Sequence, residues 1–112
     1  MKYAIAIVKE NICVGYWVNQ VDGIYPSRYI SKSRLDLFKN KDEAIEQLKF
    51  AAYHCMKIIE PHLPVIIIFQ TDSNDKLITE SKDILTEWAK QNWPHKPEWI
   101  EQIKSMTESI TL

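Results

Sequence analysis

Residues 65–69 read Val65-Ile66-Ile67-Ile68-Phe69, an unbroken apolar run in which no polar residue alternates with the apolar ones. Such a run is typical of a strand that is covered on both faces, because a strand with one face in water alternates apolar and polar side chains. Pro61 and Pro64 separate this run from the helical pattern before it. We therefore expect a buried strand here, in the middle of a sheet.

Two further strands are predicted at the start of the chain. Tyr3–Val8 and Ile12–Val18 are rich in β-branched and aromatic residues, and a polar turn of hairpin length separates them. They should pair antiparallel. In a regular second strand, Cys13 and Tyr16 lie on opposite faces, because successive side chains alternate across a sheet.

The segment that follows carries a weaker strand signal. Asp22-Gly23 marks a turn, and a third strand is expected within Tyr25–Ser31. The polar and basic residues Ser31–Lys39 match no pattern, so their structure is left open.

A helix is predicted from Asn40 to about Ile59. Asn40 is followed three residues later by Glu43, which is the form of an N-cap with a reaching carboxylate. One face of this helix carries apolar residues at helical spacing, and we assign it to the core: Ile45, Leu48, Ala52, Cys55 and Ile59.

Two aromatic residues of this helix lie away from its apolar face. Phe50, Tyr53 and Lys57 project roughly opposite to the core face, where solvent is expected. Either another helix covers these rings or they face a partner. Both alternatives stay open from the sequence, and Phe50, Tyr53 and Lys57 are candidate partner-binding residues.

Two more helices are predicted after the buried strand. Helical spacing continues from Leu77 to Trp88, with Asp75 as N-cap, and ends at Asn92-Trp93-Pro94. Pro97 suits the first turn of a last helix, whose apolar side holds Trp99, Ile100, Ile103 and Met106. Trp93 lies beside the helix break and is a fourth candidate for partner binding.

The elements therefore follow in the order β-β-β-α-β-α-α. This order predicts an α/β (α+β) domain with a mixed sheet of about four strands and helices packed on it. The strand that follows the first helix is expected to enter by a right-handed crossover into a parallel position.

Composition narrows the class of protein. The 112 residues are 46% hydrophobic and 26% charged, which is typical of one globular domain spanning residues 1–112. The net charge of −1, with basic residues spread along the chain, lacks the footprint of a nucleic-acid binder. No apolar run approaches the roughly 20 residues that span a bilayer, and no signal peptide is evident, so we expect a cytoplasmic protein.

The cysteines predict neither a metal site nor a thiol enzyme. Cys13 lies in a strand and Cys55 on the apolar face of a helix, so both are expected to be buried and reduced. The spacing of cysteines and histidines does not match a zinc site. No cofactor is expected.

One stretch resembles the ribonuclease H-like fold. Residues 65–103 contain V-I-I-I-F-Q-T-D-S-N, then L-T-E-W-A-K-Q-N-W, then P-E-W-I-E-Q-I, similar to that family's strand ending in T-D-S and its helix with spaced tryptophans. The resemblance implies that Asp72 is the strand-end metal-binding aspartate and that Glu43 or Glu46 stands near the helix glutamate. Mg or Mn would be the cofactor. The first strand carries no carboxylate before Glu10, and Asp72 equally suits a turn.

The opening order of elements also resembles that of the HicB antitoxin family, a reduced form of the same fold that holds a partner. With 11% aromatic residues, this predicts a small non-enzymatic binding protein that inhibits or neutralises a macromolecular partner, such as an antitoxin, an immunity protein or a phage-encoded inhibitor. The expected partner is another protein. A homo-oligomer, such as a homodimer, that forms through the edge of the hairpin or through the helix face with Phe50 is a third possibility. The alternative is a divalent-metal-dependent ribonuclease H-like nuclease or nucleic-acid-binding protein that uses Asp72 and Glu43.

Overall fold

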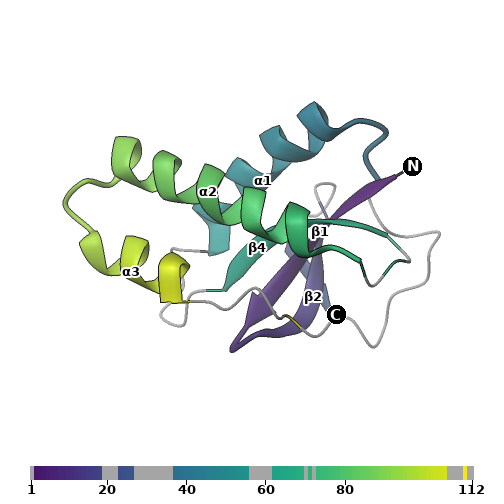
Figure 1. Ribbon diagram of the computed structural model, residues 1–112, viewed down its shortest axis with the longest axis horizontal. Coiled ribbons are helices and arrows are strands. Elements are labelled where there is room, and N and C mark those ends of the chain that lie inside the picture. Colours follow the sequence, from purple (N-terminus) through teal and green to yellow (C-terminus); the bar gives the residue numbers. More distant parts are fainter. Residues whose placement is uncertain are drawn as a thin grey trace.

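The computed structural model describes residues 2–18, 23–26, 37–55, 62–69, 71, 73–105 and 110 (Figure 1). Its helices and strands follow in the order β1 (Tyr3–Lys9), β2 (Ile12–Val18), β3 (Gly23–Pro26), α1 (Lys41–Cys55), β4 (Leu63–Ile68), α2 (Asp75–Asn92) and α3 (Pro97–Ser105). An antiparallel sheet packs against helices, which confirms the α+β class. In Figure 1, α3 folds back beneath α2.

The first two strands form the predicted hairpin. Glu10 and Asn11 occupy its turn with φ angles of 52° and 65°, as in the type I′ turns that suit the twist of a two-residue hairpin. The register shifts within the pair, because Ile7 lies opposite Gly15 whereas Val8 lies opposite Cys13. This shift is a β-bulge, and it overturns the predicted alternation of side chains in β2.

The bulge changes which side chains share a face of the sheet. Val8 and Ala6 lie on the same face of β1, and their partners in β2 are Cys13 and Tyr16. Since one extra residue interrupts the alternation between these partners, both side chains lie on one face. The expectation of opposite faces was wrong for this reason.

The sheet is antiparallel throughout the described strands, in the order β3-β2-β1-β4. The mixed sheet, with β4 parallel, was therefore a wrong prediction. The reason is a reversal of the chain before α1, where Phe38 pairs antiparallel with Tyr3 through two hydrogen bonds of 2.9 and 2.8 Å. The helix thus starts beside the beginning of β1, and β4 starts opposite Val8 at the other end and runs back.

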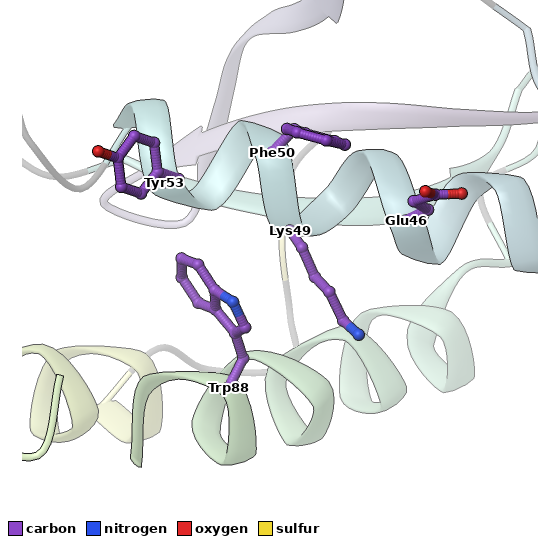
Figure 2. Close-up of a pocket in the computed structure, with 5 residues that line it drawn as sticks. All are labelled: Glu46, Lys49, Phe50, Tyr53 and Trp88. Atoms are coloured by element: carbon purple, nitrogen blue, oxygen red, sulfur yellow. The ribbon is translucent and has the colours of Figure 1, made fainter. Parts of the chain in front are cut away.

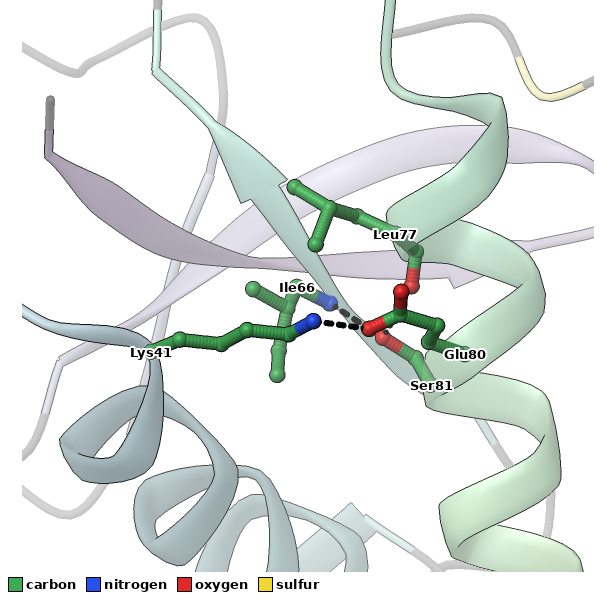
Figure 3. A network of polar contacts seen from close by, with 5 residues as sticks. All are labelled: Lys41, Ile66, Leu77, Glu80 and Ser81. Carbon is green, nitrogen blue, oxygen red and sulfur yellow. Dashed lines mark hydrogen bonds and ion pairs between the residues drawn. The ribbon is translucent and has the colours of Figure 1, made fainter.

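The predicted place of β4 in the middle of the sheet was also wrong, because this strand lies at an edge of the described sheet. Its residues 63–67 are nevertheless buried. Helix α2 lies along the free edge (Figure 3), and one side chain of α2 and one just before it accept hydrogen bonds from this edge. The Ile66 N–H donates to Ser81 Oγ at 2.9 Å, and the Ile68 N–H donates to Asn74 Oδ1 at 2.7 Å. An edge strand closed in this way can be as apolar as an interior one.

Helix α1 agrees with its sequence pattern. Asn40 Oδ1 accepts a hydrogen bond from the Glu43 N–H at 2.9 Å, as expected of an N-cap. Leu48, Ala52 and Cys55 are fully buried in the core. Ile59 and the predicted end of the helix lie outside the described residues.

Two polar contacts fix the place of α1. Trp17 Nε1 of β2 donates to Gln47 Oε1 at 3.4 Å, which holds the helix against the sheet. An ion pair between Lys41 and Glu80 joins the start of α1 to α2 (Figure 3).

The end of α2 and the start of α3 agree with the sequence prediction. Helix α2 ends at Asn92 and α3 begins at Pro97, whereas Met106 lies outside the described residues. The cap of α2 was wrong by one position, because Asn74 precedes the helix and Asp75 is its first residue. The Asn74 side chain instead bonds to the sheet, because its Oδ1 accepts from the Ile68 N–H, and its Nδ2 donates to the Thr71 carbonyl at 2.6 Å.

The third strand begins earlier than predicted, at Gly23. Of Ser31–Lys39, only residues 37–39 are described. Within the described part of the chain, no helix combines the length and apolar character needed to span a bilayer.

Candidate partner-binding groove

A groove runs between α1 and α2. It consists of two adjoining hollows of about 440 and 400 Å³ that share Lys49 and Trp88. We name it the α1–α2 groove; its lining residues are Glu46, Lys49, Phe50 and Tyr53 of α1, and Asp83, Ile84, Glu87, Trp88 and Gln91 of α2. Figure 2 shows Lys49 reaching from α1 toward α2, and Trp88 reaching from α2 toward Tyr53.

The spacing of these residues explains why they meet. On α1 they occupy positions 46, 49, 50 and 53, and on α2 positions 83, 84, 87, 88 and 91. The α1 positions and, on α2, positions 84, 87, 88 and 91 follow the i, i+3, i+4, i+7 rule, and position 83 lies one turn before 87, so each set forms one face of its helix. On α1 this face lies away from the buried Leu48 and Ala52.

The two aromatic residues predicted from the sequence remain accessible in the groove. Phe50 is 57% exposed and Tyr53 is 49% exposed. The sequence left open whether a helix covers these rings, and the structure shows an intermediate arrangement. Helix α2 lies beside them, but about half of each residue faces solvent.

Trp93 supports one end of the groove. Its ring centroid lies 4.5 Å from that of Trp88 and 4.3 Å from that of Trp99, both in edge-to-face geometry. It also stacks on Tyr53 at 5.9 Å with an interplanar angle of 18°. Edge-to-face and offset-stacked rings add to the stability gained from burial alone. Trp93 therefore joins all three helices and holds Tyr53 in place.

The groove carries more negative than positive charge. Among the described residues, its lining includes the carboxylates of Glu46, Asp83 and Glu87 against the one ammonium group of Lys49. These three acidic residues are exposed. Glu87 pairs with Lys90 at 3.4 Å on the surface of α2, and such an exposed pair contributes little to stability.

Of the remaining predicted site residues, Glu43 alone is described, and it does not line this groove. Lys57 and Asp72 lie outside the described residues. Glu43 lies exposed in the first turn of α1, where its backbone N–H is bonded to the cap residue. Among the described residues, no group of three or more histidine, cysteine, aspartate and glutamate side chains is placed to hold a metal ion.

Both thiols are buried, as the sequence predicted. Burial raises the pKa of Cys55 to about 12. Burial also raises the pKa of Cys13, although hydrogen bonds with the Gly15 backbone and with the Tyr16 side chain lower it in part. The pKa of Tyr16 rises to about 12, first because of burial and then because of Cys13. The thiolate, which is the reactive form, is therefore scarce at neutral pH.

The α2 side of the groove was missed by the sequence reasoning. Asp83 and Glu87 were not singled out, and Trp88 entered only as part of the helical spacing from Leu77. The signal present was the shared spacing of Asp83, Glu87 and Trp88 on one helical face. Only the packing of α2 beside α1 brings that face opposite Phe50.

Comparison with known proteins gives no match: no protein-family model, curated protein or solved structure aligns significantly with this chain. The ribonuclease H-like assignment therefore stays a prediction.

Proposed function

We propose that this chain is a binding protein that engages another protein through the α1–α2 groove. The observation that carries the proposal is the exposure of Phe50 and Tyr53, at 57% and 49%, beside an open groove with charged residues along it. Large aromatic residues on the surface of a small domain are typical of interaction sites when they gather around a concave patch.

The packing that holds Tyr53 in position favours binding. Tyr53 stacks on Trp93, which in turn contacts Trp88 and Trp99. Side chains that are already held in position lose little conformational freedom when a partner binds. Tyrosine and tryptophan are also the residue types that most often dominate binding energy at protein interfaces.

The sheet offers a less suitable route to a partner at the edge formed by β4. Ser81 and Asn74 accept the outward N–H groups of Ile66 and Ile68, so an added strand would have to displace α2. A helical surface, rather than strand addition at that edge, is therefore the favoured mode.

The finer form of the proposal is that binding inhibits or neutralises the partner. The small size of the chain and the opening order of its elements, which resembles that of the HicB antitoxins, support this form. Titration of the purified partner with this protein tests it: activity should fall to a minimum at stoichiometric equivalence, and full activity in the saturated complex would contradict inhibition.

Affinity capture from a lysate of the source cells tests the binding proposal. The tagged wild-type protein is compared with the double variant Phe50→Ala/Tyr53→Ala. The matched control is Ile12→Ala, because Ile12 is 55% exposed, is also apolar, and lies outside the groove.

We expect one stoichiometric protein partner with the wild type and with the Ile12 variant, and its loss with the double variant. Retention of that partner by the double variant would contradict the groove as binding site. Recovery of nucleic acid alone would contradict the proposal as a whole.

A further inference from the structure

Building on the proposed function, we infer that the segment bound in the α1–α2 groove is a basic amphipathic helix of the partner protein. Three features of the groove lead to this chemistry: its length, its apolar floor and its excess of carboxylates.

The length of the groove matches two turns of a helix. Its residues extend from position 46 to 53 on α1 and from 83 to 91 on α2. At 1.5 Å per residue, each wall is about 10–12 Å long. A helix that lies along such a groove places side chains i, i+3 or i+4, and i+7 against it.

The floor of the groove suits the apolar face of such a helix. Phe50 and Tyr53 line the α1 side, and Ile84 and Trp88 line the α2 side. Ile84 and Trp88 are partly buried and pack against the core, so they form a fixed base. Burial of the exposed parts of Phe50 and Tyr53 by apolar side chains supplies the main gain on binding.

The charges select a basic partner helix. Glu46 stands on the α1 wall, whereas Asp83 and Glu87 stand on the α2 wall. Lysine or arginine residues that flank the apolar face of the bound helix would lie near these carboxylates, whereas acidic residues there would be repelled. Arginine can also stack on Trp88 or Tyr53.

The same charges disfavour two other occupants. In a twofold contact between two copies of this chain, each described lining would bring three carboxylates and one lysine to the other, an excess of like charge that is unfavourable. A nucleic acid is a polyanion and is bound through lysine and arginine, whereas among the described lining residues Lys49 is the only cationic one.

Synthetic peptides test the inference by fluorescence anisotropy with the full-length protein. The probe is a labelled peptide of about four helical turns, with leucine at i, i+4 and i+7 and with lysine and arginine beside them. One control peptide replaces each basic residue by glutamate. A second control has the composition of the basic probe in an order that removes its apolar face.

We expect the basic probe to bind at least about tenfold more tightly than either control. Asp83→Asn/Glu87→Gln should reduce the preference for the basic probe over the acidic peptide by about tenfold. The matched control Glu98→Gln, at an exposed residue of α3 outside the groove, should leave the preference unchanged.

Equal binding of basic and acidic peptides, no binding of the basic probe, or an unchanged preference in Asp83→Asn/Glu87→Gln would overturn the inference. A different result would contradict the proposed function, namely capture of the cellular partner by the Phe50→Ala/Tyr53→Ala variant. Loss of that partner together with indifference to peptide charge would leave the binding function standing and remove only the basic helix.

Discussion

Replacing Ser81 by alanine should destabilise the sheet edge that α2 closes. Ser81 is fully buried; its Oγ accepts from the Ile66 N–H at 2.9 Å and donates to the Leu77 carbonyl at 2.7 Å. The Leu77 carbonyl lies inside α2 and keeps its helical partner, whereas the Ile66 N–H loses its acceptor. A buried group left without a partner costs about 1–3 kcal/mol. For a domain of this size that loss lowers Tm by about 4–12 °C.

Urea unfolding followed by tryptophan fluorescence measures this loss in the free energy of unfolding. The matched control is Ser105→Ala, whose hydroxyl donates to the Gln102 carbonyl at 2.9 Å on the exposed end of α3. We expect the control to change stability by less than about 0.5 kcal/mol. Equal stability of the two variants would refute the claim that Ser81 stabilises the β4 edge by accepting the Ile66 N–H. Unchanged hydrogen exchange at the Ile66 amide in Ser81→Ala would refute it as well.

Two other predictions concern the aromatic residues and the buried thiol. Trp93→Ala should lower the free energy of unfolding by about 3 kcal/mol, because three helices lose a shared contact; Phe50→Ala, at a residue 57% exposed, should lower it by about 1 kcal/mol or less. Similar losses in urea unfolding would show that Phe50 is structural. Burial raises the Cys55 pKa from 9.0 to about 12, so the folded state holds this proton more tightly than the unfolded state. Stability should therefore be fully present below pH 9 and fall as pH rises from 9 toward 12, and Cys55→Ala should reduce that slope. An equal slope in the variant would contradict this origin.

Local patterns in the sequence predicted most helix limits and the first hairpin. The cap at Asn40, the break at Asn92-Trp93-Pro94 and the start at Pro97 depend on a few neighbouring residues, so the sequence contains their causes. These features agree with the structure because capping and chain breaks are local effects.

The position of β4 could not be predicted, because two environments produce the same pattern. An apolar run such as residues 65–69 is typical of an interior strand, but it is equally stable at an edge that a helix closes with its side chains. Ser81 was the available signal, since it is a polar residue within the apolar stripe of α2. The bulge opposite Val8 likewise depends on pairing between strands and has no local signature.

The candidate site was half predictable. Phe50 and Tyr53 stood out because they lie off the apolar face of their own helix, which is a property of one helix alone. The carboxylates of Asp83 and Glu87 belong to a second helix, and their place opposite Phe50 depends on how α1 and α2 pack.

The most direct test of the α1–α2 groove is hydrogen exchange of the protein, free and in complex with the captured partner. We predict slower exchange in the complex for peptides that cover residues 46–53 of α1 and 83–91 of α2, with little change in β1 and β2. Protection confined to the β1–β2 hairpin or to α3, with exchange in the groove helices unchanged, would contradict the account.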